Sequence, residues 1–161
     1  HEVDWSTLIF FACLFITISI AKESGMINVL AKTALSITAG NPWGSFFMIA
    51  WVSAIASAFV DNIPFAVTMI PLIEILNQSP AIAAEFNSAV SPLWWALSLG
   101  VGFGGNGTLI GSSAGVIAIG LSEKYGYRIT FIQFLKIGFP FMIITLAVGC
   151  VVLMIDLMLK I

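Results

Sequence analysis

Charged side chains are scarce in this sequence, and their scarcity excludes a soluble protein. They make up 9% of the 161 residues, against about 25% in an average soluble chain. Hydrophobic residues supply 60%, and the mean hydropathy is +1.08. We therefore expect an all-α integral membrane protein whose first partner is the lipid bilayer. The six basic residues are scattered and the net charge is −2, which excludes nucleic acid as a partner.

Side chains that carry enzyme or metal chemistry are also few. His1 is the only histidine, and the two cysteines, Cys13 and Cys150, lie far apart inside apolar runs. The sequence contains no Ser-His-acid set, no metal-spaced cluster and no pair of carboxylates that could flank a cleft. We expect no enzyme, no organic cofactor and no resident metal, and we interpret the cysteines as small buried side chains.

The apolar runs predict a single transmembrane repeat with five membrane-associated segments. These are a helix over 5–21, an interfacial helix over 26–39, a re-entrant hairpin over 43–78, a broken helix over 93–122 and a helix over 131–159. The interfacial assignment follows because that segment is amphipathic and too short to span a bilayer. Residues 81–92 are expected to form a loop or interfacial turn, and 122–128 an aqueous loop.

Asp61 interrupts an otherwise apolar stretch in the predicted hairpin. An ionised carboxylate in hydrocarbon costs roughly 3 kcal/mol on insertion scales, so this side chain is expected to face a cavity, a partner or an ion. Pro64 lacks an amide donor and disfavours helical geometry at Ile63, which predicts a chain break over 61–64. The tip would then carry Asp61 and Asn62 to membrane depth.

A second interruption is the run Gly104-Gly105-Asn106-Gly107-Thr108. Each glycine costs a helix about 1 kcal/mol relative to alanine, so the run predicts a discontinuous helix. The first half would end in free carbonyls near Gly104, which can hold a cation. The second half would begin near Thr108 with free N–H groups, which favour an anion. Close packing of glycines spaced four residues apart is a second explanation, and both can hold at once.

Together the two interruptions resemble the arsenite-permease and P-protein branch of the ion transporter superfamily, which is citrate-transporter-like. The similarity extends from Val3-Asp-Trp-Ser-Thr through Asp61-Asn-Ile-Pro and Gly104-Gly-Asn-Gly-Thr to Glu123-Lys-Tyr-Gly-Tyr. Dicarboxylate/sodium symporters, more distant members of the superfamily, carry Ser-Asn-Thr at the hairpin tip, and only Asn62 matches that motif here. The difference argues against a sodium site of the dicarboxylate type and makes Asp61 a candidate carrier of a proton or cation.

The resemblance implies two inverted repeats, with the site between the hairpin tips and broken helices of both. This chain resembles the C-terminal repeat alone. Its start, His1 to Asp4, has neither an initiator methionine nor a signal peptide, which favours a fragment of a longer polypeptide. Either an N-terminal repeat or a second copy of the chain would complete the site. We expect a multi-pass protein of the cell (inner) membrane, and the resemblance implies that Lys124 and Arg128 are cytoplasmic, an orientation that the scattered basic residues leave undecided.

These features favour a secondary active transporter that works by alternating access. It would move a small anion, such as a carboxylate or oxyanion, or exchange a monovalent cation with protons, with Na⁺ or H⁺ as the coupling ion. Asp61 and Asn62 would hold a transported cation. The predicted site comprises Asp61, Asn62, Ile63, Pro64, Gly104, Gly105, Asn106, Gly107 and Thr108.

The alternative function is a membrane-embedded structural or assembly subunit that transports nothing. In that case the glycines and small residues would serve only helix packing. Asp61 distinguishes the two hypotheses, because packing alone has no use for an acid beside a proline break.

Overall fold

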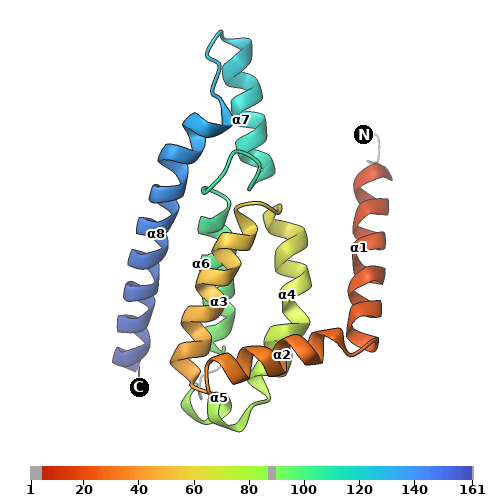
Figure 1. Cartoon of the computed structure of the whole chain (residues 1–161), viewed down its shortest axis with the longest axis vertical. Helices are drawn as coiled ribbons and strands as arrows, with labels where there is room; N and C mark the ends of the chain where they lie inside the picture. The colour runs from red at the N-terminus through yellow and green to blue at the C-terminus, as the bar shows by residue number, and fades with distance from the viewer. Residues whose placement is uncertain (1–4, 87–89, 161) are drawn as a thin grey trace.

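The computed structural model describes residues 5–86 and 90–160, and within them all regular structure is helical. The helices are α1 (Trp5–Glu23), α2 (Met26–Ile37), α3 (Pro42–Ser57), α4 (Asn62–Asn77), α5 (Pro80–Glu85), α6 (Pro92–Gly104), α7 (Ser113–Lys124) and α8 (Phe131–Lys160). The expectations for His1 to Asp4, and for residues 87–89 of the predicted loop, lie outside the described residues. Figure 1 shows α3, α4 and α6 at the centre, with α1 and α8 on opposite sides.

The centre of the molecule is a close contact between α3 and α6. A Cβ placed on Gly104 would lie 2.6 Å from the backbone oxygen of Ala54 and 2.9 Å from the Cβ of Ser57, so only glycine allows this approach. Ser53, Ala54 and Ser57 on the facing side of α3 are fully buried. The packing explanation for the glycines is therefore confirmed at Gly104, as expected for membrane helices joined through small residues.

The helices α3 and α4 form a hairpin whose tip is residues 58–61 (Figure 1). The break was predicted over 61–64, and only residue 61 of that range lies in the tip. The prediction is wrong for Asn62, Ile63 and Pro64, which form the first turn of α4. Proline is tolerated there since the first N–H groups of a helix have no intrahelical partner. Pro64 thus marks the start of a helix, and the chain reverses just before it.

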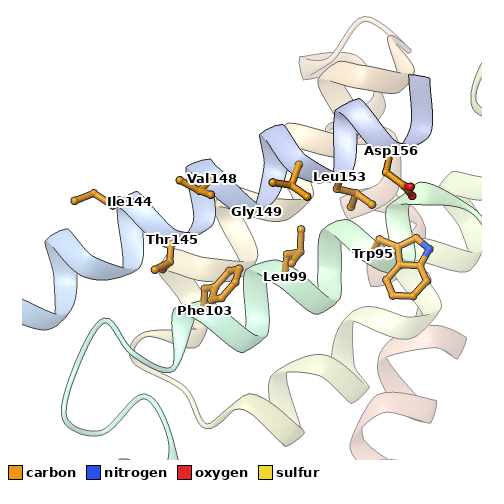
Figure 2. Close-up of a pocket in the computed structure, with 10 residues that line it drawn as sticks. Trp95, Leu99, Phe103, Ile144, Thr145, Val148, Gly149, Leu153 and Asp156 are labelled. Carbon is orange, nitrogen blue, oxygen red and sulfur yellow. The ribbon is translucent and has the colours of Figure 1, made fainter. Parts of the chain in front are cut away.

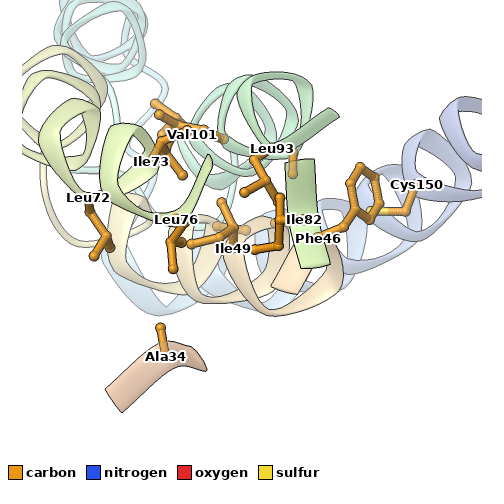
Figure 3. Packing of buried hydrophobic residues seen from close by; sticks show 14 of the residues in the cluster. Ala34, Phe46, Ile49, Leu72, Ile73, Leu76, Ile82, Leu93, Val101 and Cys150 are labelled. Atoms are coloured by element: carbon orange, nitrogen blue, oxygen red, sulfur yellow. The ribbon is translucent and has the colours of Figure 1, made fainter. Parts of the chain in front are cut away.

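A hydrophobic cluster joins the two arms of the hairpin to α5 and α6. Figure 3 shows Phe46 and Ile49 of α3 near Leu76 of α4, Ile82 of α5 and Leu93 of α6, all buried. The prediction of a loop or interfacial turn over 81–92 is therefore wrong for residues 81–85, which belong to α5, and for residue 92, where α6 begins. A six-residue helix carries too little periodicity to be read from sequence, and it forms here because the Ile82 side chain can be buried in the cluster.

Among the described residues, α8 is the one helix that is by itself long and apolar enough to cross a membrane, and its apolar window is only 17% buried. Helices α1 and α2 are long and apolar enough only when they are taken together as one span, and that span is bent by 67° where they meet. A separate span over 5–21 and an interfacial helix over 26–39 remain predictions. The arms α3 and α4 are apolar but have 16 residues each, fewer than the roughly 20 that a bilayer requires.

The break between α6 and α7 covers residues 105–112. The second half of the discontinuous helix was predicted to begin near Thr108, and it begins at Ser113. The Ser112 hydroxyl accepts a hydrogen bond from Gly115 N at 3.1 Å, so this serine caps the new helix. The predicted aqueous loop over 122–128 is wrong for its first three residues, because α7 continues to Lys124.

Candidate functional site

The hairpin tip and the helix break, 50 residues apart in sequence, lie against each other. The Thr108 hydroxyl donates a hydrogen bond to the backbone oxygen of Ala58 at the tip, and Thr108 is 1% exposed. A Cβ on Gly107 would lie 3.0 Å from the Ala58 Cβ, and one on Gly111 would lie 2.9 Å from the Ala58 oxygen. The structure therefore brings together the two predicted interruptions at one junction.

Asp61 links the starts of two helices at this junction. Its Oδ1 accepts a hydrogen bond from Ile63 N at 3.2 Å, in the first turn of α4. Its Oδ2 accepts one from Ser113 N at 3.1 Å, the first residue of α7. Both N-termini carry partial positive charge, and a carboxylate is the side chain that such ends favour. Asp61 is half-buried, so these two backbone donors supply the polar surroundings that hydrocarbon would deny it.

Asn62 fills the space between α6 and the break. With its amide nitrogen toward the backbone carbonyls, it donates to Val101 O at 3.2 Å and Gly111 O at 2.9 Å. A Cβ on Gly105 would lie 2.8 Å from both terminal atoms of the amide, so Asn62 needs a glycine at that position. Gly111 lies in the break between α6 and α7, where its carbonyl has no regular helical partner, and the Asn62 amide supplies one.

The sequence-based prediction missed Ser57, a buried member of the junction. Its hydroxyl donates to Val101 O at 3.2 Å and accepts a hydrogen bond from the Asn62 amide nitrogen at 2.7 Å. The available signal is the run of small residues from Ser53 to Ala58, which is equally typical of a helix-packing surface. Ser57 serves both roles, because its Cβ also faces Gly104.

The remaining predicted residues differ in their placement. Ile63 is 53% exposed and contributes its backbone N–H, while Pro64 is half-buried in the first turn of α4. Asn106 is exposed, and within the described residues no hydrogen bond joins its side chain to Asp61 or Asn62. Asn106 lines a cavity of about 880 Å³, whose other polar lining residues include Tyr127, Arg128 and Gln133.

A second concavity lies away from the junction, between α6 and α8. Figure 2 shows this groove, which measures about 590 Å³ and has an apolar lining that includes Trp95, Phe103 and Val148, with Asp156 near one end. None of the predicted site residues lines it. An apolar groove on the surface of a membrane-embedded helix pair does not supply the converging polar groups of an ion site, so we place the candidate site at the junction.

Comparison with known proteins identifies the family. A family model described as citrate transporter matches residues 1–100, which is more than half of the 161-residue chain and includes the hairpin tip. The chain belongs to the citrate transporter family. No solved structure matches the chain.

Curated relatives of this citrate transporter family member include animal and bacterial proteins. The P protein of Sus scrofa is 40% identical over 154 residues, covering 92% of this chain and 18% of the relative. The P protein of Homo sapiens is 38% identical over 154 residues, with the same coverages. An uncharacterized transporter of Mycobacterium tuberculosis is 39% identical over 152 residues, covering 94% of this chain and 34% of the relative.

These comparisons confirm the resemblance to the P-protein branch and support a membrane transport protein, not an enzyme. The chain spans about a fifth of the length of the P proteins and about a third of the mycobacterial transporter. The aligned stretches of 154 and 152 residues are too long to omit the hairpin, the break or α8. The whole junction therefore lies within the part of the chain that the relatives share.

Proposed function

We propose that this chain is one repeat of a multi-pass secondary active transporter in the cell (inner) membrane. It moves a small anion of the carboxylate or oxyanion class, or exchanges a monovalent cation with protons, by alternating access. The observation that carries the proposal is the bonding of Asp61. Its two carboxylate oxygens accept hydrogen bonds from N–H groups at the N-termini of α4 and α7. A charged residue at the meeting point of two interrupted helices is typical of ion pathways in transporters.

The junction offers groups for either sign of charge. The N-termini of α4 and α7 favour an anion. The Asp61 carboxylate and the backbone oxygens around the break, such as those of Val101 and Gly111, can coordinate a cation. A proton and a cation would compete for Asp61 because each neutralises the same charge. That competition is the minimum that exchange requires.

The hairpin fits a re-entrant loop, and a second half is needed to close the site. Each arm has 16 residues, and Ala58, Thr108 and Gly111 at the junction are buried, as irregular backbone at membrane depth has to be. One repeat covers a transport site from one side only. An inverted N-terminal repeat or a second copy of the chain would supply the facing hairpin and broken helix.

The experiment that tests the function is solute flux into proteoliposomes that contain the full-length protein. Citrate, arsenite and Na⁺ would be scanned as solutes, each with and without a proton gradient. We expect saturable flux of one class of solute that responds to the proton gradient. Flux no faster than that of protein-free liposomes for every solute would contradict the proposal.

The second candidate function is a structural subunit without transport activity. The observation that favours it is the fit of Gly104 against α3, together with the capping and packing contacts that account for Asp61 and Asn62 without any ion. The same flux scan separates the two functions, because a structural subunit leaves every solute at the background rate.

A further inference from the structure

The helix α7 has little to hold it in place. None of its described residues is buried, and no other helix packs along it. Figure 1 shows α7 projecting beyond the hairpin tip. Its first residue, Ser113, donates to Asp61 Oδ2 at 3.1 Å, which is the single hydrogen bond between α7 and the hairpin within the described residues. The residue two positions before α7 is also tied to the hairpin, because the Asn62 amide donates to Gly111 O at 2.9 Å. From that anchor, the Asp61 carboxylate sets the direction in which the first turn of α7 leaves the hairpin tip.

The bond depends on the charge of Asp61, because no other charged side chain is near. Helices α3 and α6 contain no ionisable residue, and within the described residues the two hydrogen bonds to the Asp61 carboxylate both come from backbone N–H groups. On α4, Glu74 lies near the opposite end and pairs with Lys22 at 3.6 Å. On α7, Glu123 and Lys124 occupy the last turn.

An N–H bond to an ionised carboxylate is roughly twice as strong as one to a neutral acceptor, and the positive ends of both helices attract a negatively charged side chain. Neutralising Asp61 therefore weakens its bonds to Ile63 N and Ser113 N together. The hairpin arm α4 stays packed in the hydrophobic cluster through Leu72, Ile73 and Leu76. Within this chain the helix α7 has no buried residue, so the loss of a bond at its first residue affects its position more than that of α4.

We propose that Asp61 is a charge-dependent latch that holds α7 against the hairpin tip and releases it when the carboxylate is neutralised. Asp61 then acts as a positioning residue, and the moving part is the half-helix that begins at Ser113. The latch rests on the proposed function at one point, because it takes the transported proton to be the species that neutralises Asp61. It adds the structural consequence, a change in the position of α7, which the function alone does not specify.

Pulsed electron–electron spin resonance on the full-length protein in liposomes tests the latch. One spin-label pair, at the exposed residues Ile70 of α4 and Tyr125 just after α7, reports the position of α7 relative to the hairpin. A reference pair, at the exposed residues Val52 of α3 and Trp95 of α6, reports the packed centre. The background would carry replacements of Cys13, Cys150 and any other cysteine of the full-length protein.

We expect one narrow distance distribution for the α4–α7 pair at alkaline pH and a second population at acidic pH. Asp61→Asn keeps the side-chain shape and an acceptor oxygen but removes the charge. It should raise the second population at alkaline pH at least fivefold and abolish its pH dependence. Asp61→Glu keeps the charge and should retain the pH dependence. The reference pair should not change in any variant.

Ser112→Ala is the matched control, because it removes the cap on Gly115 N without touching Asp61. It should loosen the first turn of α7 and leave the pH dependence in place. The latch is wrong if Asp61→Asn gives the wild-type distributions, or if Ser112→Ala abolishes the pH dependence as Asp61→Asn does. If Asp61→Asn loses proton-dependent flux without a change in distances, the latch fails and the proposed function stands. If the distances change and flux keeps its proton dependence, the latch stands and the coupling role of Asp61 fails.

Discussion

At the scale of single residues, the junction is defined by how one amide fits against one glycine. The terminal atoms of Asn62 lie where a Cβ on Gly105 would approach to 2.8 Å. The amide cannot withdraw without losing its bonds to Val101 O and Gly111 O. Because both acceptors are backbone atoms, the side chain has no alternative position that keeps both bonds, and without it Gly111 O would lose its donor.

We predict that Gly105→Ala destabilises the protein by about 1 to 3 kcal/mol, the usual cost of forcing an extra carbon into a packed site. Gly102→Ala, three residues earlier in α6, is the control, since nothing lies within 4 Å of the added Cβ there. It should be neutral or slightly stabilising, because alanine favours a helix more than glycine does. Thermal unfolding of the detergent-solubilised protein measures both. Equal effects of the two substitutions would show that Asn62 does not occupy this position.

Much of the site could be predicted from residue types alone. An acid and an amide in an apolar run single out Asp61 and Asn62, because hydrocarbon penalises them wherever they point. Ser57 could not be found in this way, since a serine in a small-residue run is equally suited to plain helix packing. Asn106 illustrates the opposite case. Its polarity correctly indicates the break, but the sequence does not tell in which direction the side chain points.

At the scale of elements, the existence of both interruptions could be predicted, but their boundaries could not. Proline suits the first turn of a helix as well as a break, so Pro64 alone does not tell which side of it the chain reverses on. The start of α7 at Ser113 depends on a capping serine and on the bond to Asp61, a partner 52 residues away. Only the folded chain brings that partner into range.

The closeness of α3 and α6 gives a prediction at the same scale. Gly104→Ala places a Cβ 2.6 Å from the Ala54 oxygen and 2.9 Å from the Ala54 Cα, and neither backbone atom can rotate away. The two helices must separate, which we expect to cost about 1 to 3 kcal/mol and to lower the detergent concentration at which the protein unfolds. Gly120→Ala on α7, where the added carbon meets open space, should leave that midpoint unchanged. A tolerated Gly104→Ala would contradict the close contact.

At the scale of the whole molecule, much of the surface of α6, α7 and α8 is available to lipid or to a further part of the transporter. The apolar window of α8 is only 17% buried, and α7 has no buried residue. Composition predicted the membrane class because it sums over all residues. The inverted repeat could not be derived in this way, since it relates this chain to a second set of helices.

Proton-dependent flux in proteoliposomes tests the central claim, that the charge of Asp61 couples transport to protons, most directly. The comparison is between wild type, Asp61→Asn and Glu74→Gln. Glu74 is the carboxylate within α4, and its side chain is exposed near the end of the helix that lies far from Asp61. We expect Asp61→Asn to insert and fold normally and to lose the pH dependence of flux, while Glu74→Gln keeps it. Wild-type flux with unchanged pH dependence in Asp61→Asn would show that the coupling charge lies elsewhere.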